Sequence, residues 1–376
     1  MPYPADYGGV FDLFYKIKAL YHSGVKIHLH CFEYGRGKQP ELNQYCEEVH
    51  YYKRNKSISG FLQRLPYIVS SRKNPQLLKN LLKDNAPVLL EGIHCTYYLY
   101  NGSLQNRKVL VRLHNVEFEY YHQLEKSTKA IFKKIYFFIE SILLKRYEAV
   151  IAHKAKLLAV NEKDKCIYQN EFGAKDVAFL PVFLPFNEVK SKTGRGTFCL
   201  YQGNLSVPEN EKAVLWLLEN VFNNLKKDFV VAGKNPSAFL KKILKQNEKA
   251  RLIENPSEEK MEELITNAHI HLLPSFNATG IKIKLLNALF NGRFIITNHA
   301  SLEGTGLETL CEIADTPQDY KEIIQRLSAA SFFEEEVIKR NTILQSKYNT
   351  DKNVQKLIEW LYENEANEEW KTNQHL

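Results

Sequence analysis

Short apolar runs and amphipathic segments alternate along most of the chain. Apolar runs of strand length occur at 25–32, 86–94, 108–115, 156–164 and 176–186. Segments at 76–84 and 117–156 instead repeat their apolar residues every three or four positions, which is the helical period. This alternation predicts the α/β class, with parallel sheets in a doubly wound arrangement.

The pattern pauses at 187–196, where NEVKSKTGRG is polar, contains two glycines and is typical of a linker. Strands are then predicted at 197–206, 228–236, 269–276 and 293–298, with helices at 212–222 and 280–292. A last amphipathic helix is predicted at 353–370. We therefore expect an N-terminal domain at 1–190, a C-terminal domain at 191–350 and a terminal segment at 351–376.

Composition fits two folded domains. The chain has 376 residues, of which 44% are apolar and 12% aromatic, enough for two cores. The six cysteines show no C-x-x-C spacing, so we expect reduced thiols and a cytoplasmic location. The longest apolar stretch, at 130–152, is interrupted by charged residues and is not expected to cross a membrane.

The positive charge lies in the first half of the chain. Residues 1–190 carry a net charge of +10, whereas the rest carry −2. A phosphorylated substrate, a lipid headgroup surface or a nucleic acid could each meet a basic domain. No helix-turn-helix, zinc-finger or RNP-like motif occurs, so a nucleic-acid partner is not expected.

The segment PSFNATGIKIKLLNALFNG, at 274–292, holds the most informative junction. A strand is predicted to end at Pro274 and a helix to begin at Thr279-Gly280. Free amides at a helix start favour an anion, and Lys282 and Lys284 add positive charge. Asn287 would lie on the same helix face as Thr279, where its amide could bind a sugar hydroxyl. The alternative is a Rossmann-like helix with a solvated lysine face.

Two more strand-to-helix junctions follow the linker. Gly203 and Asn204 end one predicted strand, and Lys234 follows another. Each junction alone indicates little more than a helix start. Three such junctions in one domain favour a phosphate or nucleotide site.

The N-terminal half places polar groups after two buried strands. His114 lies at the end of the strand predicted at 108–115 and Glu117 comes just after it, while Glu91 and His94 lie at the end of the one at 86–94. His114 could act as an acid, base or hydrogen-bond donor near neutral pH, because such positions often face a ligand. For His94 a structural role is an equal alternative.

Several catalytic motifs do not occur. The sequence has no D-x-D, no P-loop, no G-x-S-x-G and no H-E-x-x-H. No histidine group has zinc spacing, so no metal site is expected.

Several segments together resemble a known family. GNLSVPEN, AGKNPS, TGIKIKLLNALFNGRFIITN and EGTGL, in the second half, are similar to GT-B glycosyltransferases of family 4, the glycosyl transferases group 1. PYPADYGG, EGIH, RLHNVEFEYY and AVNEKD resemble their N-terminal half. The resemblance implies two Rossmann-like domains facing across a cleft, with the C-terminal helix crossing back to the first domain.

The resemblance also implies a function. The chain would transfer a sugar from a UDP- or GDP-sugar to a glycan or lipid-linked acceptor, with retention and without metal or cofactor, in surface polysaccharide or glycolipid synthesis. His114 would contact the donor sugar. Donor-binding positions would be Gly203, Asn204, Lys234, Thr279, Gly280, Ile281, Lys282 and Asn287. Acceptor-side positions would be Gly8, Gly9, His94 and Glu117.

This sequence departs from the family pattern at four positions. Thr279 and Asn287 stand where two glutamates are common, and Asn204 and Glu209 stand where an Arg and a Lys usually meet the diphosphate. Lys234 and Lys282 are the candidate replacement cations. These departures leave open two alternatives, a nucleotide-sugar epimerase and a non-catalytic binding subunit of GT-B fold.

The opening glycine pair raises a question about the first strand. In the family that the chain resembles, a loop like PYPADYGG follows the central first strand. Here only seven residues precede Gly8. We therefore expect that strand to be missing from the stated start, leaving a gap or an unusual filler beside the strand at 25–32.

A membrane surface is a further candidate partner, at the inner face of the membrane. Basic residues gather at Lys53, Arg54, Lys56, Arg64, Arg72 and Lys73. The predicted helix also carries Ile131, Phe132, Ile135, Phe138, Ile139 and Ile142 beside Lys133, Lys134, Lys145 and Arg146. It could lie on anionic lipid. The alternative, favoured by the sequence alone, is a core helix with a solvated basic edge.

Overall fold

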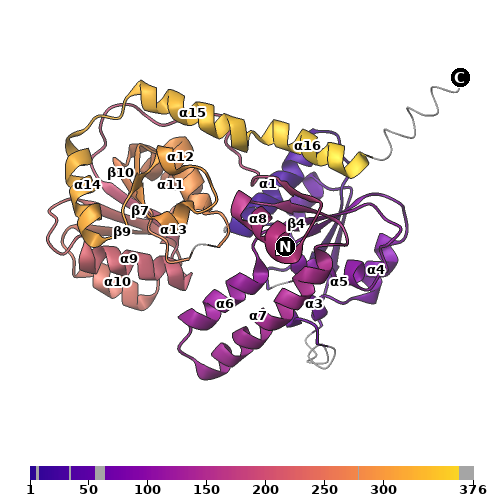
Figure 1. Cartoon of the computed structure of the whole chain (residues 1–376). Coiled ribbons are helices and arrows are strands. Elements are labelled where there is room, and N and C mark those ends of the chain that lie inside the picture. Colours follow the sequence, from indigo (N-terminus) through magenta and orange to yellow (C-terminus); the bar gives the residue numbers. More distant parts are fainter. Residues whose placement is uncertain (6–7, 34, 56–63, 278, 364–376) are drawn as a thin grey trace, which may run out of the picture. The chain divides into compact units, whose positions relative to one another are not determined.

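The computed structural model describes residues 1–5, 8–33, 35–55, 64–277 and 279–363 (Figure 1). The chain forms two compact units. Unit 1 comprises Met1–Pro185 and Thr350–Leu376, and unit 2 comprises Phe186–Asn349. The boundary predicted after residue 190 lies in the polar segment that follows Pro185. Lys56 and residues 364–370 of the predicted last helix lie outside the described residues.

The main sheet of unit 1 is parallel. It contains β3 (Val88–Glu91), β4 (Val109–Leu113), β5 (Lys156–Ala159) and β6 (Val177–Phe179) in that order. The register pairs Glu91 with Arg112, at the carboxyl ends of β3 and β4. Every residue of β4 is buried, as expected for a strand covered on both faces. The predicted strands are present, although each is shorter than its apolar run.

A second, smaller sheet in unit 1 contains β1 (His28–Phe32) and β2 (Glu48–Tyr52), which are parallel. Among the described residues β1 pairs with no strand other than β2. The absence of the first strand of the family pattern stays a prediction. Residues 1–5 form no strand, and α1 (Gly8–His22) begins at the glycine pair.

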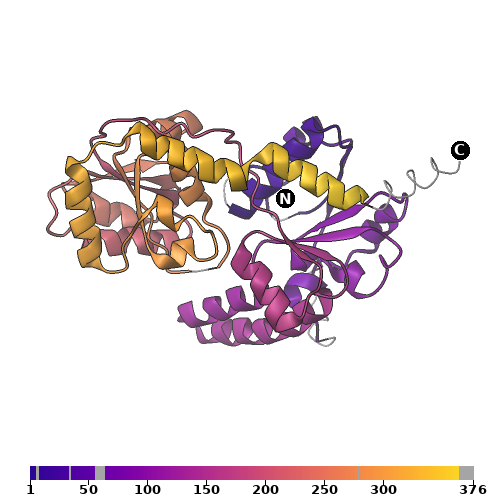
Figure 2. The same ribbon diagram turned by 45° about the horizontal axis from the view of Figure 1, so that its top comes forward.

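Short helices and one long hairpin surround the sheets of unit 1. They are η1 (Pro40–Gln44), α3 (Tyr67–Ser70), α4 (Pro75–Leu81), η2 (Ile93–Cys95), α5 (Tyr97–Tyr100), α6 (Glu117–Ser127), α7 (Ile131–Ile151) and α8 (Glu162–Phe172). The helical region predicted at 117–156 consists of two helices, because Thr128 and Ala130 are extended and separate α6 from α7. α6 and α7 lie side by side as a hairpin (Figure 2).

Unit 2 has one parallel sheet with the order β12-β11-β10-β7-β8-β9. The strands are β7 (Cys199–Asn204), β8 (Phe229–Lys234), β9 (Ala250–Glu254), β10 (Ile270–Leu272), β11 (Phe294–Thr297) and β12 (Glu312–Ile313). The strand order reverses between β7 and β10. Ligands of doubly wound folds bind at such a reversal, outside the carboxyl ends of the strands.

The helices of unit 2 connect these strands. They are α9 (Pro208–Asn220), α10 (Ala238–Lys245), α11 (Glu258–Asn267), α12 (Ile283–Asn291), α13 (His299–Leu302), η3 (Glu308–Leu310), α14 (Pro317–Ala329) and α15 (Glu334–Tyr348). The helix predicted to begin at Thr279-Gly280 begins only at Ile283. Gly280 has a φ of +62°, outside the helical region, so the chain turns there before the helix starts.

The last described helix, α16 (Thr350–Tyr362), belongs to unit 1. Val354, Leu357 and Leu361 share an apolar cluster with Ala19 and Leu20 of α1. This confirms the prediction that the C-terminal helix packs on the N-terminal domain. Among the described helices, none is both long and apolar enough to span a bilayer.

The packing of α16 gives a stability prediction. Leu357 is fully buried, so Leu357→Ala removes its transfer free energy and leaves a cavity. We expect a loss of about 2–5 kcal/mol in the free energy of unfolding, measured by urea titration with circular dichroism. Lys356→Ala, an exposed neighbour on the same helix, should change it by less than about 0.5 kcal/mol. Equal effects of the two variants would contradict this packing.

Candidate active site

Polar side chains from β3 and β4 meet at the carboxyl edge of the sheet of unit 1. Glu91 ends β3, and His114 directly follows β4. His114 Nε2 lies 3.0 Å from Glu91 Oε2, and both side chains are largely buried. The hydrogen bond fixes the orientation of the imidazole ring. The sequence predicted both residues near a site, but not their pairing.

Two charged side chains of α1 reach the same place. Lys16 Nζ lies 3.2 Å from Asp12 Oδ2 and 2.8 Å from Glu91 Oε1. Asp12 Oδ2 also lies 3.2 Å from Arg112 NH2, and 3.8 Å from His114 Nδ1. We call these five residues the buried charge network. It contains two carboxylates, two permanent cations and one histidine.

Backbone groups complete the network. Asp12 Oδ1 accepts a hydrogen bond of 2.7 Å from the amide of Phe183. Arg112 donates to the carbonyls of Leu180 and Pro181. The segment after β6 is therefore tied to α1 and to β4 through buried charged groups. A buried charge requires such partners, because its desolvation is otherwise too costly.

The positive charges of the network control the ionisation of its carboxyls. Burial would raise the pKa of Asp12, but Arg112 and Lys16 outweigh burial and hold that pKa well below its usual value. The pKa of Glu91 is also lowered, because Lys16 and the hydrogen bond from His114 outweigh burial. Both carboxyls are therefore ionised at neutral pH.

His94 lies in the turn after β3. Gly92 has a φ of +92°, and a Cβ at this position would lie 2.5 Å from the imidazole Cε1 of His94. The ring thus folds back over a position that only glycine allows. Burial lowers the pKa of His94 well below its usual value, and the charge of Arg72 lowers it further. His94 is a neutral ring at pH 7, and its acceptor-side role stays a prediction.

Glu117 begins α6 and is buried. The amides of Glu117 and Phe118 each donate a 2.9 Å hydrogen bond to the carboxylate of Glu148, on α7. Glu148 therefore occupies the place where an anion would bind to the start of α6. Burial raises the pKa of Glu117 itself to about 7, although Arg72 opposes this shift.

Gly8 and Gly9 form the first turn of α1, which also carries Asp12. Their position links the opening glycine pair to the buried charge network through one helix. Their acceptor-side role, like that of Glu117, stays a prediction.

In unit 2, the two junctions predicted at Gly203-Asn204 and at Lys234 lie next to each other. The register of β7 and β8 pairs Gly203 with Gly233, and Asn204 with Lys234. A Cβ at Gly233 would lie 1.9 Å from the carbonyl oxygen of Gly203, so this approach requires glycine. Lys234 is exposed at the strand end. The side chain of Asn204 is already hydrogen-bonded, because its Oδ1 accepts from the amide and the hydroxyl of Ser206.

A lysine that the sequence assigned only to general positive charge, Lys284, lies half-buried beside the same strand. Lys284 Nζ lies 3.0 Å from the Tyr201 hydroxyl and 2.9 Å from Asn210 Oδ1. Asn210 also donates to the carbonyl of Asn204. Burial lowers the pKa of Lys284 to about 8, although the charge of Glu209 opposes the shift. Lys284 therefore holds β7 and the start of α9 in place.

The loop between β10 and α12 is folded by its own side chains. Asn277 Oδ1 accepts hydrogen bonds of 2.8 Å from both the amide and the hydroxyl of Thr279. Lys282 Nζ donates a 2.7 Å hydrogen bond to the Thr279 carbonyl. Ser275 Oγ donates to Glu209 Oε1 at 2.9 Å, which connects the loop to the start of α9. This hydrogen bond thus connects the junction after β7 with the junction after β10.

The predicted shared helix face of Thr279 and Asn287 is wrong. α12 begins at Ile283, so Thr279 is not part of the helix. The helical spacing of 100° per residue therefore does not relate Thr279 to Asn287. Asn287 instead accepts hydrogen bonds from Asn291 Nδ2, one turn later. Gly280 and Ile281 lie in the turn before the helix, as the sequence had placed them near its start.

Among the described residues, the group with metal-binding side chains close together is Asp12, Glu91 and His114. Both carboxylates already contact Lys16, and Asp12 also contacts Arg112. The cations of the protein thus take the places that a metal ion would need, and these residues do not fit one.

Sequence reasoning missed Asp12, Lys16 and Asn210. All three lie on amphipathic helices, where a polar residue normally faces water. For Asp12 and Lys16, one signal was available: they are one turn apart with opposite charges, but exposed pairs have the same spacing.

Known proteins resemble the chain. Residues 196–330 match the family model described as Glycosyl transferases group 1. A Klebsiella pneumoniae protein, described as an uncharacterized 44.6 kDa protein in the cps region, is 28% identical over 371 residues. The match covers 93% of this chain and 95% of that protein.

Solved structures have the same fold over most of the chain. HepE of Anabaena, in complex with UDP and glucose, has a TM-score of 0.64 at 12% identity and covers 94% of this chain and 96% of its own. A sucrose-phosphate synthase from Thermosynechococcus elongatus has a TM-score of 0.63 at 12% identity, with coverages of 98% and 93%. These likenesses confirm the predicted GT-B fold. The family match confirms the resemblance to glycosyl transferases group 1.

The buried charge network makes a prediction about stability. Lys16→Met leaves Glu91 without its closest cation and weakens the compensation of Asp12. We expect the free energy of unfolding to fall by about 3–5 kcal/mol at pH 7, measured by urea titration. Lys26→Met, an exposed lysine of the same unit, is the matched control and should have little effect. A small effect of Lys16→Met would contradict the network.

The same variant has a pH dependence of defined sign. The folded pKa values of Asp12 and Glu91 lie below their unfolded values. Their ion pairs therefore contribute fully above pH 4–5 and lose their contribution as the pH falls through the folded pKa values. The difference between wild type and Lys16→Met should shrink in acid. A difference that grows in acid would contradict this ionisation.

Proposed function

We propose that the chain transfers a sugar from a nucleotide-activated donor to a glycan or lipid-linked acceptor, as a retaining glycosyltransferase that needs no metal or cofactor. A UDP- or GDP-sugar is the expected donor. The observation that carries the proposal is the pair of hydrogen-bonded loops after β7 and β10, at the strand reversal of unit 2. These loops lie within the segment that matches glycosyl transferases group 1. HepE, whose structure contains UDP and glucose, supports the choice of donor class.

The start of α12 is the proposed diphosphate site. Lys282 is its N-cap residue and makes no side-chain hydrogen bond to the first turn, so that turn offers amides to an anion. Gly280 has no side chain to block the approach. Lys282 supplies a positive charge at the same place, and Lys234 supplies another at the end of β8. Lys284 is half-buried and hydrogen-bonded to Tyr201 and Asn210, so we assign it to supporting the site rather than to contacting the donor.

Charge develops on the leaving diphosphate as the bond to the sugar breaks. A cation and helix amides placed at that charge stabilise the transition state more than the ground state. This contribution is the main chemical task that the proposal assigns to Lys282 and to the first turn of α12.

His114 is the residue that we assign to the donor sugar, in line with the family resemblance. Its ring is held through Nε2 by Glu91, and its surroundings contain two carboxylates and two cations. The network therefore balances its own charge. Glu91 is a positioning residue in this proposal, because it acts through the imidazole.

The proposed acceptor class follows from the description of one relative. The Klebsiella pneumoniae relative is described by its place in a cps region, which supports a role in surface polysaccharide biosynthesis. We propose a glycan or lipid-linked sugar as acceptor on this ground. His94, Glu117 and the turn at Gly8-Gly9 are its proposed neighbours.

One observation favours a non-catalytic binding subunit as the second candidate. Thr279 and Asn287 replace the two glutamates of the family pattern, and both are engaged in local hydrogen bonds. A subunit of this kind could bind a nucleotide sugar or glycan without turnover. A GT-B epimerase, the other alternative, would convert the nucleotide sugar without any acceptor.

A panel of UDP- and GDP-sugars tests donor binding and turnover together. We expect at least one to raise the Tm of the chain and to release its nucleoside diphosphate. Lys282→Ala should lower that turnover about 100-fold or more, because it removes a cation from the leaving group. Lys245→Ala, at an exposed lysine of α10, is the matched control.

Three results would contradict parts of this proposal. Unchanged turnover in Lys282→Ala would remove this lysine from the site. Binding without turnover would favour the non-catalytic subunit. No stabilisation by any member of the panel would contradict a nucleotide-sugar site.

Glu91→Gln tests the positioning of His114. The variant keeps the size of the side chain but removes its charge, so the imidazole loses its ionic partner. We expect kcat to fall about 10- to 100-fold with a smaller change in KM, and the pH profile of kcat to shift. Glu359→Gln, an exposed glutamate of α16, is the control. An unchanged kcat and pH profile would exclude this role for Glu91.

A further inference from the structure

The outward side of α7 is apolar. Six large side chains on its first three turns are exposed, from 40% for Ile142 to 86% for Phe132. We call this row the α7 stripe; it consists of Ile131, Phe132, Ile135, Phe138, Ile139 and Ile142. The sequence alone favoured a core helix with a solvated basic edge; α7 does contribute Leu144, Tyr147 and Ile151 to the core, but the six residues of the stripe are exposed.

Helix geometry places the stripe opposite the buried side of α7. At 100° per residue, its six positions fall within an arc of about 120°. Leu144, Tyr147 and Ile151 point to the other side, where they enter the core of unit 1. α7 is thus apolar on both sides. A helix in a water-soluble unit normally turns a polar face to the solvent, so the stripe calls for a partner.

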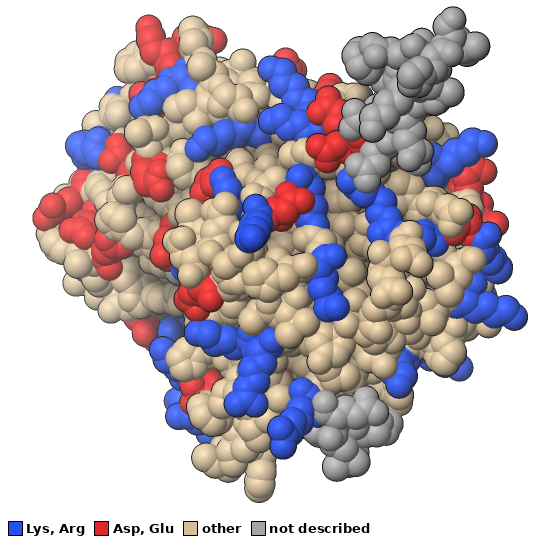
Figure 3. Space-filling model, turned by 45° about the vertical axis from the view of Figure 1, so that its right-hand side comes forward, with Lys and Arg blue, Asp and Glu red and all other residues tan. Residues whose placement is uncertain are grey.

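The charges around the stripe are distributed by sign. The two glutamates of α7 are buried: Glu140 accepts a hydrogen bond from the amide of Tyr67, and Glu148 holds the start of α6. The cations of the hairpin are exposed; they are Lys126, Lys129, Lys133, Lys134, Lys145 and Arg146. Figure 3 shows basic side chains beside uncharged surface at the lower end of the view, where the α6–α7 hairpin lies.

Part of this positive charge is already compensated. Lys134 pairs with Glu125 at 3.5 Å, and Lys145 pairs with Glu171 at 3.0 Å. In the described part of the chain, Lys129, Lys133 and Arg146 have no such acidic partner. At 100° per residue, Arg146 lies within the arc of the stripe, and Lys134 and Lys145 lie beside one edge of it, whereas Lys133 lies on the opposite side of α7. With Lys134 and Lys145 paired to glutamates, Arg146 leaves net positive charge at the stripe.

We propose that the α7 stripe binds the surface of an anionic lipid bilayer. Apolar side chains would enter the boundary between headgroups and acyl chains, while the lysines and the arginine would meet lipid phosphates. A second copy of the chain is a poorer fit, because pairing two stripes would bring two sets of unpaired cations together. This binding goes beyond glycosyl transfer and requires no sugar substrate.

Sedimentation with vesicles tests the proposal on the full chain. The vesicles contain phosphatidylcholine alone or phosphatidylcholine with phosphatidylglycerol. We expect binding to the anionic vesicles to be at least about tenfold stronger, and to weaken in 0.5 M salt because surface charges are then screened. Binding that is equal on both vesicle types, or absent from both, would overturn the proposal.

Two variants separate the apolar and the ionic parts. Phe132→Ser with Ile135→Ser should lower vesicle binding about tenfold or more, since both side chains are proposed to enter the bilayer. Lys129→Gln and Arg146→Gln combined should lower it to a similar extent and weaken its salt dependence. The substituted side chains are exposed, and an unchanged Tm verifies that each variant is folded.

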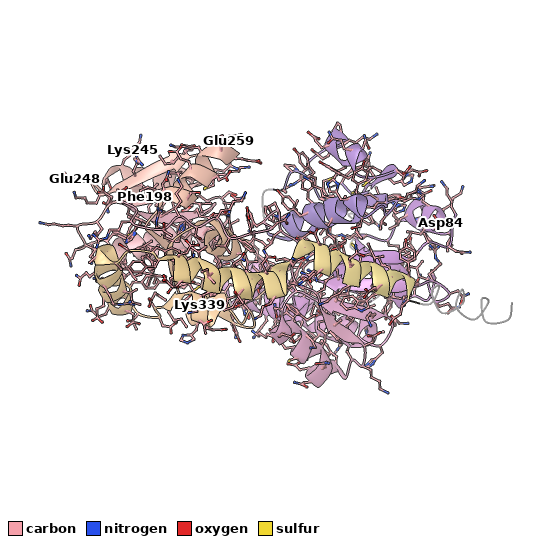
Figure 4. All side chains as sticks on the ribbon, turned by 90° about the horizontal axis from the view of Figure 1, so that it is seen from above. Asp84, Phe198, Lys245, Glu248, Glu259 and Lys339 are labelled. Carbon is pink, nitrogen blue, oxygen red and sulfur yellow. The ribbon has the colours of Figure 1, made fainter. Side chains whose placement is uncertain are left out.

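Matched controls come from unit 2. Phe333→Ser with Ile338→Ser changes two apolar side chains of similar exposure, 62% and 59%. Lys245→Gln with Lys339→Gln changes two exposed lysines, one on α10 and one on α15, both labelled in Figure 4. Both controls should bind vesicles like wild type. A loss of binding in the controls equal to that in the α7 variants would overturn the assignment to the stripe.

Analytical ultracentrifugation tests the alternative occupant. We expect a monomer whose sedimentation does not change in Phe132→Ser with Ile135→Ser. A dimer that this variant dissociates, together with no vesicle binding, would assign the stripe to a second copy and overturn the lipid proposal.

Discussion

The carboxylate of Asp12 joins three parts of unit 1 that are distant in the sequence. It pairs with Lys16 on α1 and with Arg112 on β4, and it accepts the amide of Phe183 after β6. The two carboxylates and the two cations of the buried charge network can be buried only together, because the loss of any one leaves an uncompensated charge. The orientation of His114 depends on this set through Glu91. The proposed chemistry of the first unit therefore rests on how α1 packs against the sheet.

Unit 2 uses a related construction at its strand reversal. Lys284 donates hydrogen bonds to Tyr201 and Asn210, and Glu209 accepts one from Ser275 of the neighbouring loop. These contacts keep the glycine turns of β7 and β10 together without using the exposed Lys234. The cation that supports the scaffold is thus separate from the cations proposed to meet the donor, so the scaffold does not depend on a bound ligand.

The strands were predictable because runs such as VLVRL, at 109–113, are buried on both faces. Glu91 and His114 were predictable as neighbours, since adjacent parallel strands end at one edge. Asp12 was not, because its partner Arg112 lies 100 residues away and only the tertiary structure brings the two together. The start of α12 was missed because the side chain of Asn277 forms a local turn with Thr279. For α7, periodicity shows a helix with apolar residues but cannot tell which of them face the sheet.

Proton NMR of UDP- and GDP-sugars, incubated with the chain, a glycolipid extract as acceptor source and EDTA, tests sugar transfer most directly. We expect one donor to disappear while its nucleoside diphosphate and a new glycosidic signal appear, with the anomeric configuration of the donor retained. The persistence of every donor, or its conversion to another nucleotide sugar without acceptor, would contradict the proposed transferase.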